Sequence, residues 1–128
     1  MQAPKNFQKI LLICQGSYFL LTALWAIVDI DSFMAVTGPK TDIWLVKTVA
    51  VLLIPISTSL LLSAVLPSTI WQPVFLGLVS AVVLAVIDFY YSGNNTIDKI
   101  YMLDGFLECI FVIGWIYIIM RLCNNKIS

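Results

Sequence analysis

The 128-residue chain contains no histidine, and only 11% of its residues are charged. The absence of histidine excludes histidine general bases, histidine-ligated haem and most zinc sites. The three cysteines (Cys14, Cys109 and Cys123) lack CxxC spacing and lie in or beside apolar runs, so we expect them to be buried and inert. A P-loop, a GxGxxG motif and an HExxH motif are also lacking, so the sequence predicts neither a cofactor nor a metal.

Positive and negative charges balance, since the net charge is zero, and no basic patch is present. Nucleic acid is therefore not an expected partner. What the chain has in quantity is apolar residues, which make up 61% of it. A soluble domain is nearer half apolar and about a quarter charged. A chain of this length has no interior large enough to hide the excess, so lipid is the expected solvent.

Apolar runs long enough to cross a bilayer, which takes roughly 20 residues, occur four times. The expected spans cover residues 10–30, 42–65, 73–91 and 97–121. Turn residues such as Gly38-Pro39 and Ser92-Gly93-Asn94-Asn95 separate them. Backbone groups in lipid must be satisfied within each segment, and short connections make neighbours antiparallel. The sequence thus predicts a single all-α integral membrane domain over residues 1–128, folded as an antiparallel up-down four-helix transmembrane bundle.

Lysine and arginine predict how these spans are oriented. Lys5, Lys9, Arg121 and Lys126 flank the two chain ends, whereas Lys40 and Lys99 lie on the opposite side. Cytoplasmic loops carry the excess of these residues. We therefore expect both termini to be cytoplasmic.

Polar and aromatic residues recur along each span at helical spacing, so they form stripes. Ionisable groups within spans avoid lipid, and the stripes should face inward. Together they predict an outward-opening polar pocket. Its expected ligand-binding residues are Gln15, Tyr18, Thr22, Lys47, Asp88, Tyr101, Asp104 and Glu108.

Lys47 lies in an otherwise apolar segment and requires a counter-charge. Asp104 lies at a similar depth, and Glu108 is deeper, roughly 18 Å from the outer helix end. A buried ion pair between Lys47 and one of these acids is the favoured interpretation; the alternative is that the lysine stem lifts its ammonium to the outer interface. Because one lysine cannot compensate two acids, Glu108 should hold a proton or meet a bound cation. Gln15 has a suitable height to hydrogen-bond a neutral Glu108.

These residues favour a binding or transport-associated function, in which the pocket takes a small amphiphile, a lipid headgroup or a cation; an accessory subunit is one form of this function. Two other functions fit as well. One is a membrane-embedded enzyme that uses Glu108 or Asp104 as acid or base, with Lys47 as electrostatic partner. The other is a purely structural assembly subunit. Membrane lipid is an expected partner, and both homo- and hetero-oligomers remain open.

The resemblance to known proteins lies in two stretches, VTGPKTDIWLVKT and IYMLDGFLE followed by Trp115. They are similar to a group of small uncharacterised bacterial four-span integral membrane proteins. The resemblance implies the four-span architecture and a bacterial inner membrane, and it implies no activity. The chain also matches the small multidrug-resistance transporters in size and span number. Those transporters carry their key carboxylate in the first span, where this chain has Gln15, and this departure argues against membership.

Overall fold

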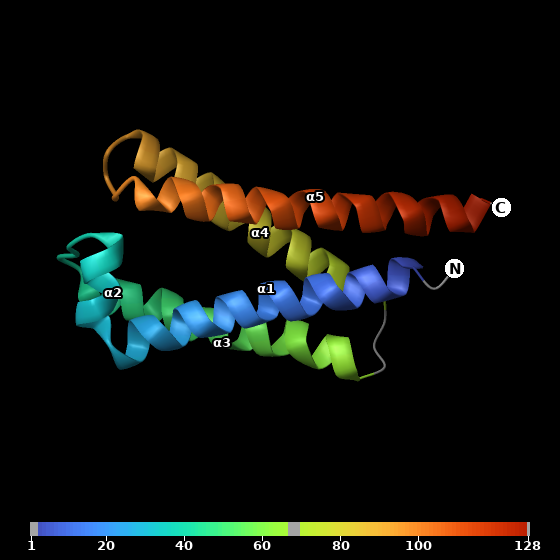
Figure 1. Cartoon of the computed structure of the whole chain (residues 1–128), viewed down its shortest axis with the longest axis horizontal. Helices are drawn as coiled ribbons and strands as arrows, with labels where there is room; N and C mark the ends of the chain where they lie inside the picture. The colour runs from blue at the N-terminus through green and yellow to red at the C-terminus, as the bar shows by residue number, and fades with distance from the viewer. Residues whose placement is uncertain (1–2, 67–69, 128) are drawn as a thin grey trace.

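The computed structural model of the chain describes residues 3–66 and 70–127, which form five α-helices and no strand (Figure 1). The helices are α1 (Ala3–Val28), α2 (Ile30–Thr37), α3 (Ile43–Val65), α4 (Trp71–Gly93) and α5 (Ile100–Ile127). Four of them, α1, α3, α4 and α5, are long and apolar enough to cross a membrane. The prediction of an all-helical chain with four long apolar helices is therefore confirmed.

The short helix α2 was not predicted, because the first span was expected to continue to residue 30. The helix instead breaks at Asp29, whose backbone leaves the helical region at φ −138° and ψ 77°. The Asp29 carboxylate accepts a hydrogen bond from the Ser32 backbone N–H at 3.1 Å and so caps α2. The same bond lowers the pKa of the Asp29 carboxyl group below its usual value. An aspartate followed three residues later by serine therefore starts a new helix where the sequence suggested a loop.

The long helices pack in two pairs, α1 against α3 and α4 against α5. Figure 1 shows that α1 begins and α5 ends at the same end of the molecule, whereas α2 lies at the other end. Smaller contacts of α1 with α4 and α5, and of α3 with α4, join the two pairs. Helix α1 is thus the element through which the first pair reaches α5.

The core lies where these helices meet. Its most deeply buried apolar side chains are Phe19, Leu60, Val74, Ala81, Trp115 and Ile118. A second, smaller cluster joins α1, α2 and α3 through Ala23, Ala26, Phe33 and Ala50. The core is therefore shared by both helix pairs.

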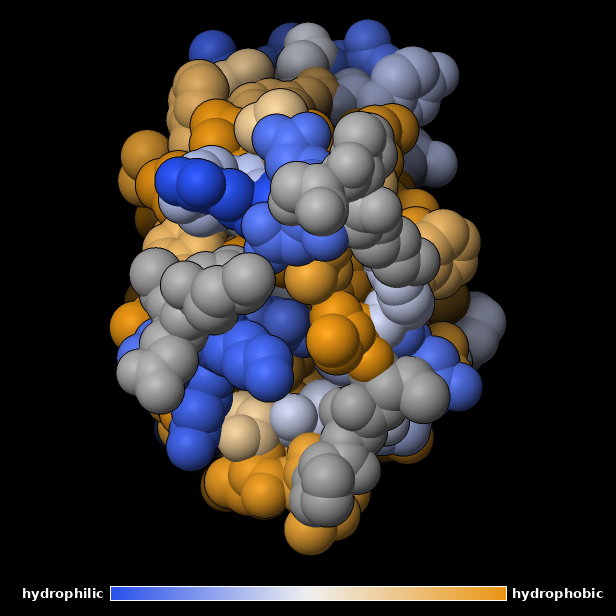
Figure 2. All heavy atoms as spheres, turned by 90° about the vertical axis from the view of Figure 1, so that its right-hand side faces the viewer, coloured by the Kyte–Doolittle hydropathy of each residue, from blue (hydrophilic) through white to orange (hydrophobic). Residues whose placement is uncertain are grey.

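Large apolar side chains also cover the outside of the long helices. Leu21, Leu52, Phe75 and Leu103 are each more than half exposed. Figure 2 views the end at which α1 begins and α5 ends, where hydrophilic residues gather on the face and hydrophobic residues lie around its sides. The expectation of buried cysteines is wrong for two of the three, since Cys14 and Cys123 lie on the exposed faces of their helices.

Candidate functional site

Gln15 is fully buried and links α1 to both α4 and α5. Its side-chain amide donates to the carbonyl of Gly77 at 2.9 Å and to the Ser80 hydroxyl at 3.3 Å. Its carbonyl oxygen accepts from the Trp115 indole N–H at 2.7 Å. The expected hydrogen bond to Glu108 is therefore wrong, because the Gln15 side chain is already engaged by groups on α4 and α5. The structure gives Gln15 the role of a polar anchor between helices.

Asp104 is held by a residue from the opposite helix pair. The Tyr18 hydroxyl of α1 donates a hydrogen bond to Asp104 Oδ1 on α5. The Thr22 hydroxyl, one turn further along α1, donates to the backbone carbonyl of Tyr18 at 2.8 Å. The helical stripe that the sequence predicted on α1 therefore faces the stripe on α5. An O–H donor to a carboxylate is among the stronger hydrogen bonds in proteins, so the contact fixes the orientation of Asp104.

A groove of about 280 Å³ runs over this contact, between α1, α2 and the first turns of α5. Its lining comprises Tyr18, Thr22, Trp25, Phe33, Val36, Thr37, Ile100, Tyr101, Leu103, Asp104 and Leu107. Four of the predicted site residues (Tyr18, Thr22, Tyr101 and Asp104) are among them. The wall formed by Phe33, Val36 and Thr37 belongs to α2, a helix that was not predicted. The sequence signal for α2 was the capping pair of Asp29 and Ser32. Asp104 supplies the carboxylate in a lining whose other residues are aromatic or apolar, apart from Thr22 and Thr37.

Two more carboxyl groups are buried and do not line the groove. Glu108 is fully buried, and Asp88 is 5% exposed. Within the described part of the chain, both oxygens of Glu108 and Oδ2 of Asp88 have no hydrogen-bond partner. The charges of Asp88, Asp104 and Glu108 are close enough to interact. Among the described residues, no group of three or more acidic or cysteine side chains is placed to hold a metal ion.

Lys47 does not reach these acids. Its side chain is exposed, and it forms no ion pair within residues 3–66 and 70–127. The reason is the lateral order of the helices: α3 contacts α1 and α4, but it makes no contact with α5 in the described ranges. The similar depth expected for Lys47 and Asp104 would not bring them together, because the two helices are not neighbours. The predicted Lys47 ion pair is wrong, and the alternative, a side chain that extends toward the interface, fits the exposed position.

Lys40 is the lysine that reaches the groove residues, whereas in the sequence it indicated only the orientation of the chain. Its ammonium donates to the carbonyls of Thr37 at 2.7 Å and Gly38 at 3.0 Å. It also lies 5.0 Å from the centre of the Tyr101 ring, within cation–π range. Partial burial lowers the pKa of Lys40, and the nearby charge of Asp98 opposes that shift. The sequence signal for this position of Lys40 was the Gly38-Pro39 turn, since the turn brings the chain back toward α5.

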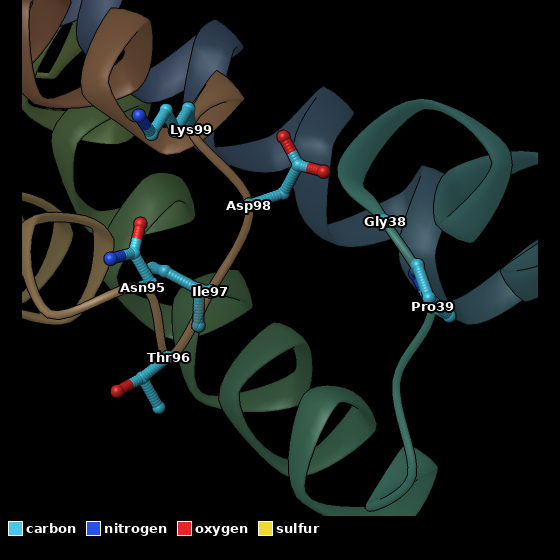
Figure 3. Close-up of a pocket in the computed structure, with 7 residues that line it drawn as sticks. All are labelled: Gly38, Pro39, Asn95, Thr96, Ile97, Asp98 and Lys99. Atoms are coloured by element: carbon cyan, nitrogen blue, oxygen red, sulfur yellow. The ribbon is translucent and has the colours of Figure 1, made fainter.

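Beside Lys40, the loop before α3 meets the loop before α5 at a hollow of about 520 Å³. Figure 3 shows the Asp98 carboxylate pointing toward Gly38, while Lys99 points away from it. Gly38 has a φ of +87°, and a Cβ there would lie 3.0 Å from the Asp98 Cβ. Both the backbone conformation and the close approach therefore favour glycine at this position. The contact keeps the loop that carries Lys40 against the start of α5.

Comparison of the sequence with family models finds no match, and comparisons with curated proteins and with solved structures find none either.

Proposed function

We propose that this chain is an integral membrane protein with an antiparallel up-down bundle of four transmembrane helices, placed in a bacterial inner membrane with both termini cytoplasmic. Four long apolar helices and the exposed Leu, Val, Ile and Phe side chains on their outer faces support this proposal. The orientation is supported by Lys5 and Lys9 near the start of α1 and by Arg121 and Lys126 near the end of α5.

We further propose that the groove above Asp104 binds a small amphiphile with a positively charged head. The observation that carries this proposal is one carboxylate set among aromatic rings, with Asp104, Tyr18, Tyr101 and Trp25 in one lining. A carboxylate supplies the counter-charge, and aromatic faces attract cations when water is excluded. The apolar remainder of the lining suits a hydrocarbon or aryl group. Lys40 illustrates the chemistry, since its own ammonium already lies over the Tyr101 ring.

A positively charged lipid headgroup would satisfy the same groups as a free amphiphile. A membrane-embedded enzyme is the weaker candidate, because Glu108 is buried away from the groove and Lys47 lies on an exposed face of α3. Asp104 is the remaining acid at the groove. It carries the binding role here as the counter-ion of the ligand.

The experiment compares two probes of the same shape with the protein in nanodiscs of zwitterionic lipid. Benzyltrimethylammonium carries a positive charge, and neopentylbenzene is its neutral isostere. We expect calorimetry to detect binding of the cation and the neutral isostere not to compete with it. Loss of the carboxylate in Asp104→Asn should weaken cation binding about tenfold or more, since interactions with a charged partner contribute roughly 1.5–3 kcal/mol.

Asp31→Asn is the matched control, because Asp31 is an exposed aspartate on α2 outside the groove lining. It removes the same charge and should leave the affinity unchanged. Equal weakening by both variants would indicate a general surface-charge effect. Equal binding of cation and isostere, or no binding of the cation, would overturn the proposed function.

A further inference from the structure

Glu108 is the only glutamate in the chain. Its side chain is fully buried, and neither of its oxygens has a hydrogen-bond partner among the described residues. Asp88 on α4 repeats the pattern with one buried oxygen that lacks a partner in the same part of the chain. The proposed binding groove does not include either residue. The interior thus holds two carboxyl groups whose chemistry the groove itself does not use.

A carboxylate keeps its charge in a protein interior only when donors or a cation compensate it. Among the described residues, the ionisable groups that interact with Glu108 are Tyr18 from α1, Asp88 from α4 and Asp104 from its own helix. All of them are neutral or negative. The two lysines that could have helped lie elsewhere, since Lys47 is exposed on α3 and the Lys40 ammonium lies over Tyr101. A neutral carboxylic acid is the form that this environment accommodates.

We infer that Glu108, with Asp88 beside it, is a proton-binding site, and that a cation entering the groove next to Asp104 displaces the Glu108 proton. The second half of this inference rests on the proposed function. In the exchange, the O–H bond of the Glu108 carboxyl group breaks, its electron pair stays on the oxygen, and the proton passes to water. The charge of the site is conserved, because one cation enters as one proton leaves.

The coupling has a geometric basis. Asp104 lines the groove, and Glu108 follows it one helical turn deeper on the same face of α5. A cation beside Asp104 would add a positive charge one helical turn from Glu108, whereas the Lys40 ammonium stays over the Tyr101 ring. The cation would therefore stabilise the carboxylate form of Glu108. Because binding releases a proton, the affinity for the cation should rise about tenfold per pH unit wherever Glu108 is protonated in the free protein.

The sole glutamate makes the test specific without a mutation. Cell-free synthesis with glutamate carrying ¹³C in its side-chain carboxyl group shifts only the infrared bands of Glu108. In nanodiscs at neutral pH without probe, we expect an isotope-shifted C=O band of a protonated acid. Saturating benzyltrimethylammonium should replace it by a carboxylate band, whereas neutral neopentylbenzene should leave it in place.

Each failure has a separate meaning. A carboxylate band in the probe-free protein overturns the proton site. A protonated band that persists although calorimetry shows bound cation overturns the displacement, and the proposed function then stands. A protonated band in a protein that does not bind the cation overturns the proposed function and the displacement, and the proton site then stands alone.

Discussion

The indole N–H of Trp115 on α5 donates to the side-chain carbonyl of Gln15 on α1 at 2.7 Å, across 100 residues of sequence. Both side chains are fully buried, so this bond and the Gln15 amide bond to Gly77 form a polar crossing point inside an apolar core. A buried polar group left without its partner costs more than the bond itself contributes. The crossing point should therefore fix how the two helix pairs dock.

The first prediction follows from the cost of leaving a buried polar group without its partner. Gln15→Leu leaves the Trp115 N–H and the Ser80 hydroxyl without their Gln15 partner, and should lower the free energy of unfolding by about 1–3 kcal/mol. Adding Trp115→Phe removes the stranded indole donor, so the double variant should lose less than the sum of the two single variants. Unfolding in mixed detergent micelles measures the free energies of the wild type, the two single variants and the double variant. Gln72→Leu, at an exposed position of α4, is the control and should change little.

The second prediction concerns the close approach of α4 and α5. A Cβ at Gly77 would lie 2.5 Å from the Trp115 ring, which is closer than atoms can pack. Trp115 is fully buried and cannot swing aside, so Gly77→Ala should cost about 1–3 kcal/mol of stability through overpacking. Gly93→Ala on the same helix meets nothing within 4 Å and should be neutral. Equal stability of the two variants would contradict the close contact between Gly77 and the Trp115 ring.

The sequence could predict which residues share one face of a single helix. Tyr18 and Thr22 share one face of α1, and Tyr101 and Asp104 share one face of α5, because the helical repeat places them there. Those four residues line one groove in the structure. Apolar length alone was enough to predict the four long helices.

The lateral order of helices could not be read from the same pattern. Depth along the helix placed Lys47 level with Asp104, but nothing in the periodicity of α3 states which neighbour it has. Packing of Ala50 and Leu53 with α1 and α2 decides that, and it turns Lys47 outward. Helix α2 was missed because eight residues are too few for a periodic signal. Only the capping chemistry of Asp29 marked its start.

The third prediction tests the position of Lys47. Because the side chain is exposed and forms no ion pair among the described residues, Lys47→Met should change stability by no more than about 0.5 kcal/mol. Loss of one member of a buried pair would cost about 3–5 kcal/mol instead. Combining it with Asp104→Asn should give the sum of the single effects. A double variant more stable than that sum would restore the ion pair that the structure rejects.

The fourth prediction tests the proposed topology by cysteine labelling in inverted and right-side-out vesicles. Asn94 follows α4 and Asn124 lies near the end of α5, and both are exposed. In a background with Cys14, Cys109 and Cys123 replaced by serine, Asn124→Cys should react from the cytoplasmic side and Asn94→Cys from the outer side. Labelling of both positions from one side would contradict a membrane-crossing α5.

The last prediction uses the pH dependence of Lys40. Burial lowers the folded-state pKa of this lysine below its ordinary value of 10.5, so the unfolded chain binds more protons in the window between the two values. Stability contributed by this residue must then rise with pH through that window, because deprotonation relieves the cost of burying the charge. The thermal midpoint of wild type, measured relative to Lys40→Met, should therefore increase as the pH approaches 10.5 from below. Lys99→Met controls for loss of a lysine at an exposed position of the neighbouring loop. A difference between wild type and Lys40→Met that falls with pH would mean that attraction to Asp98 or the Tyr101 ring outweighs burial at this position.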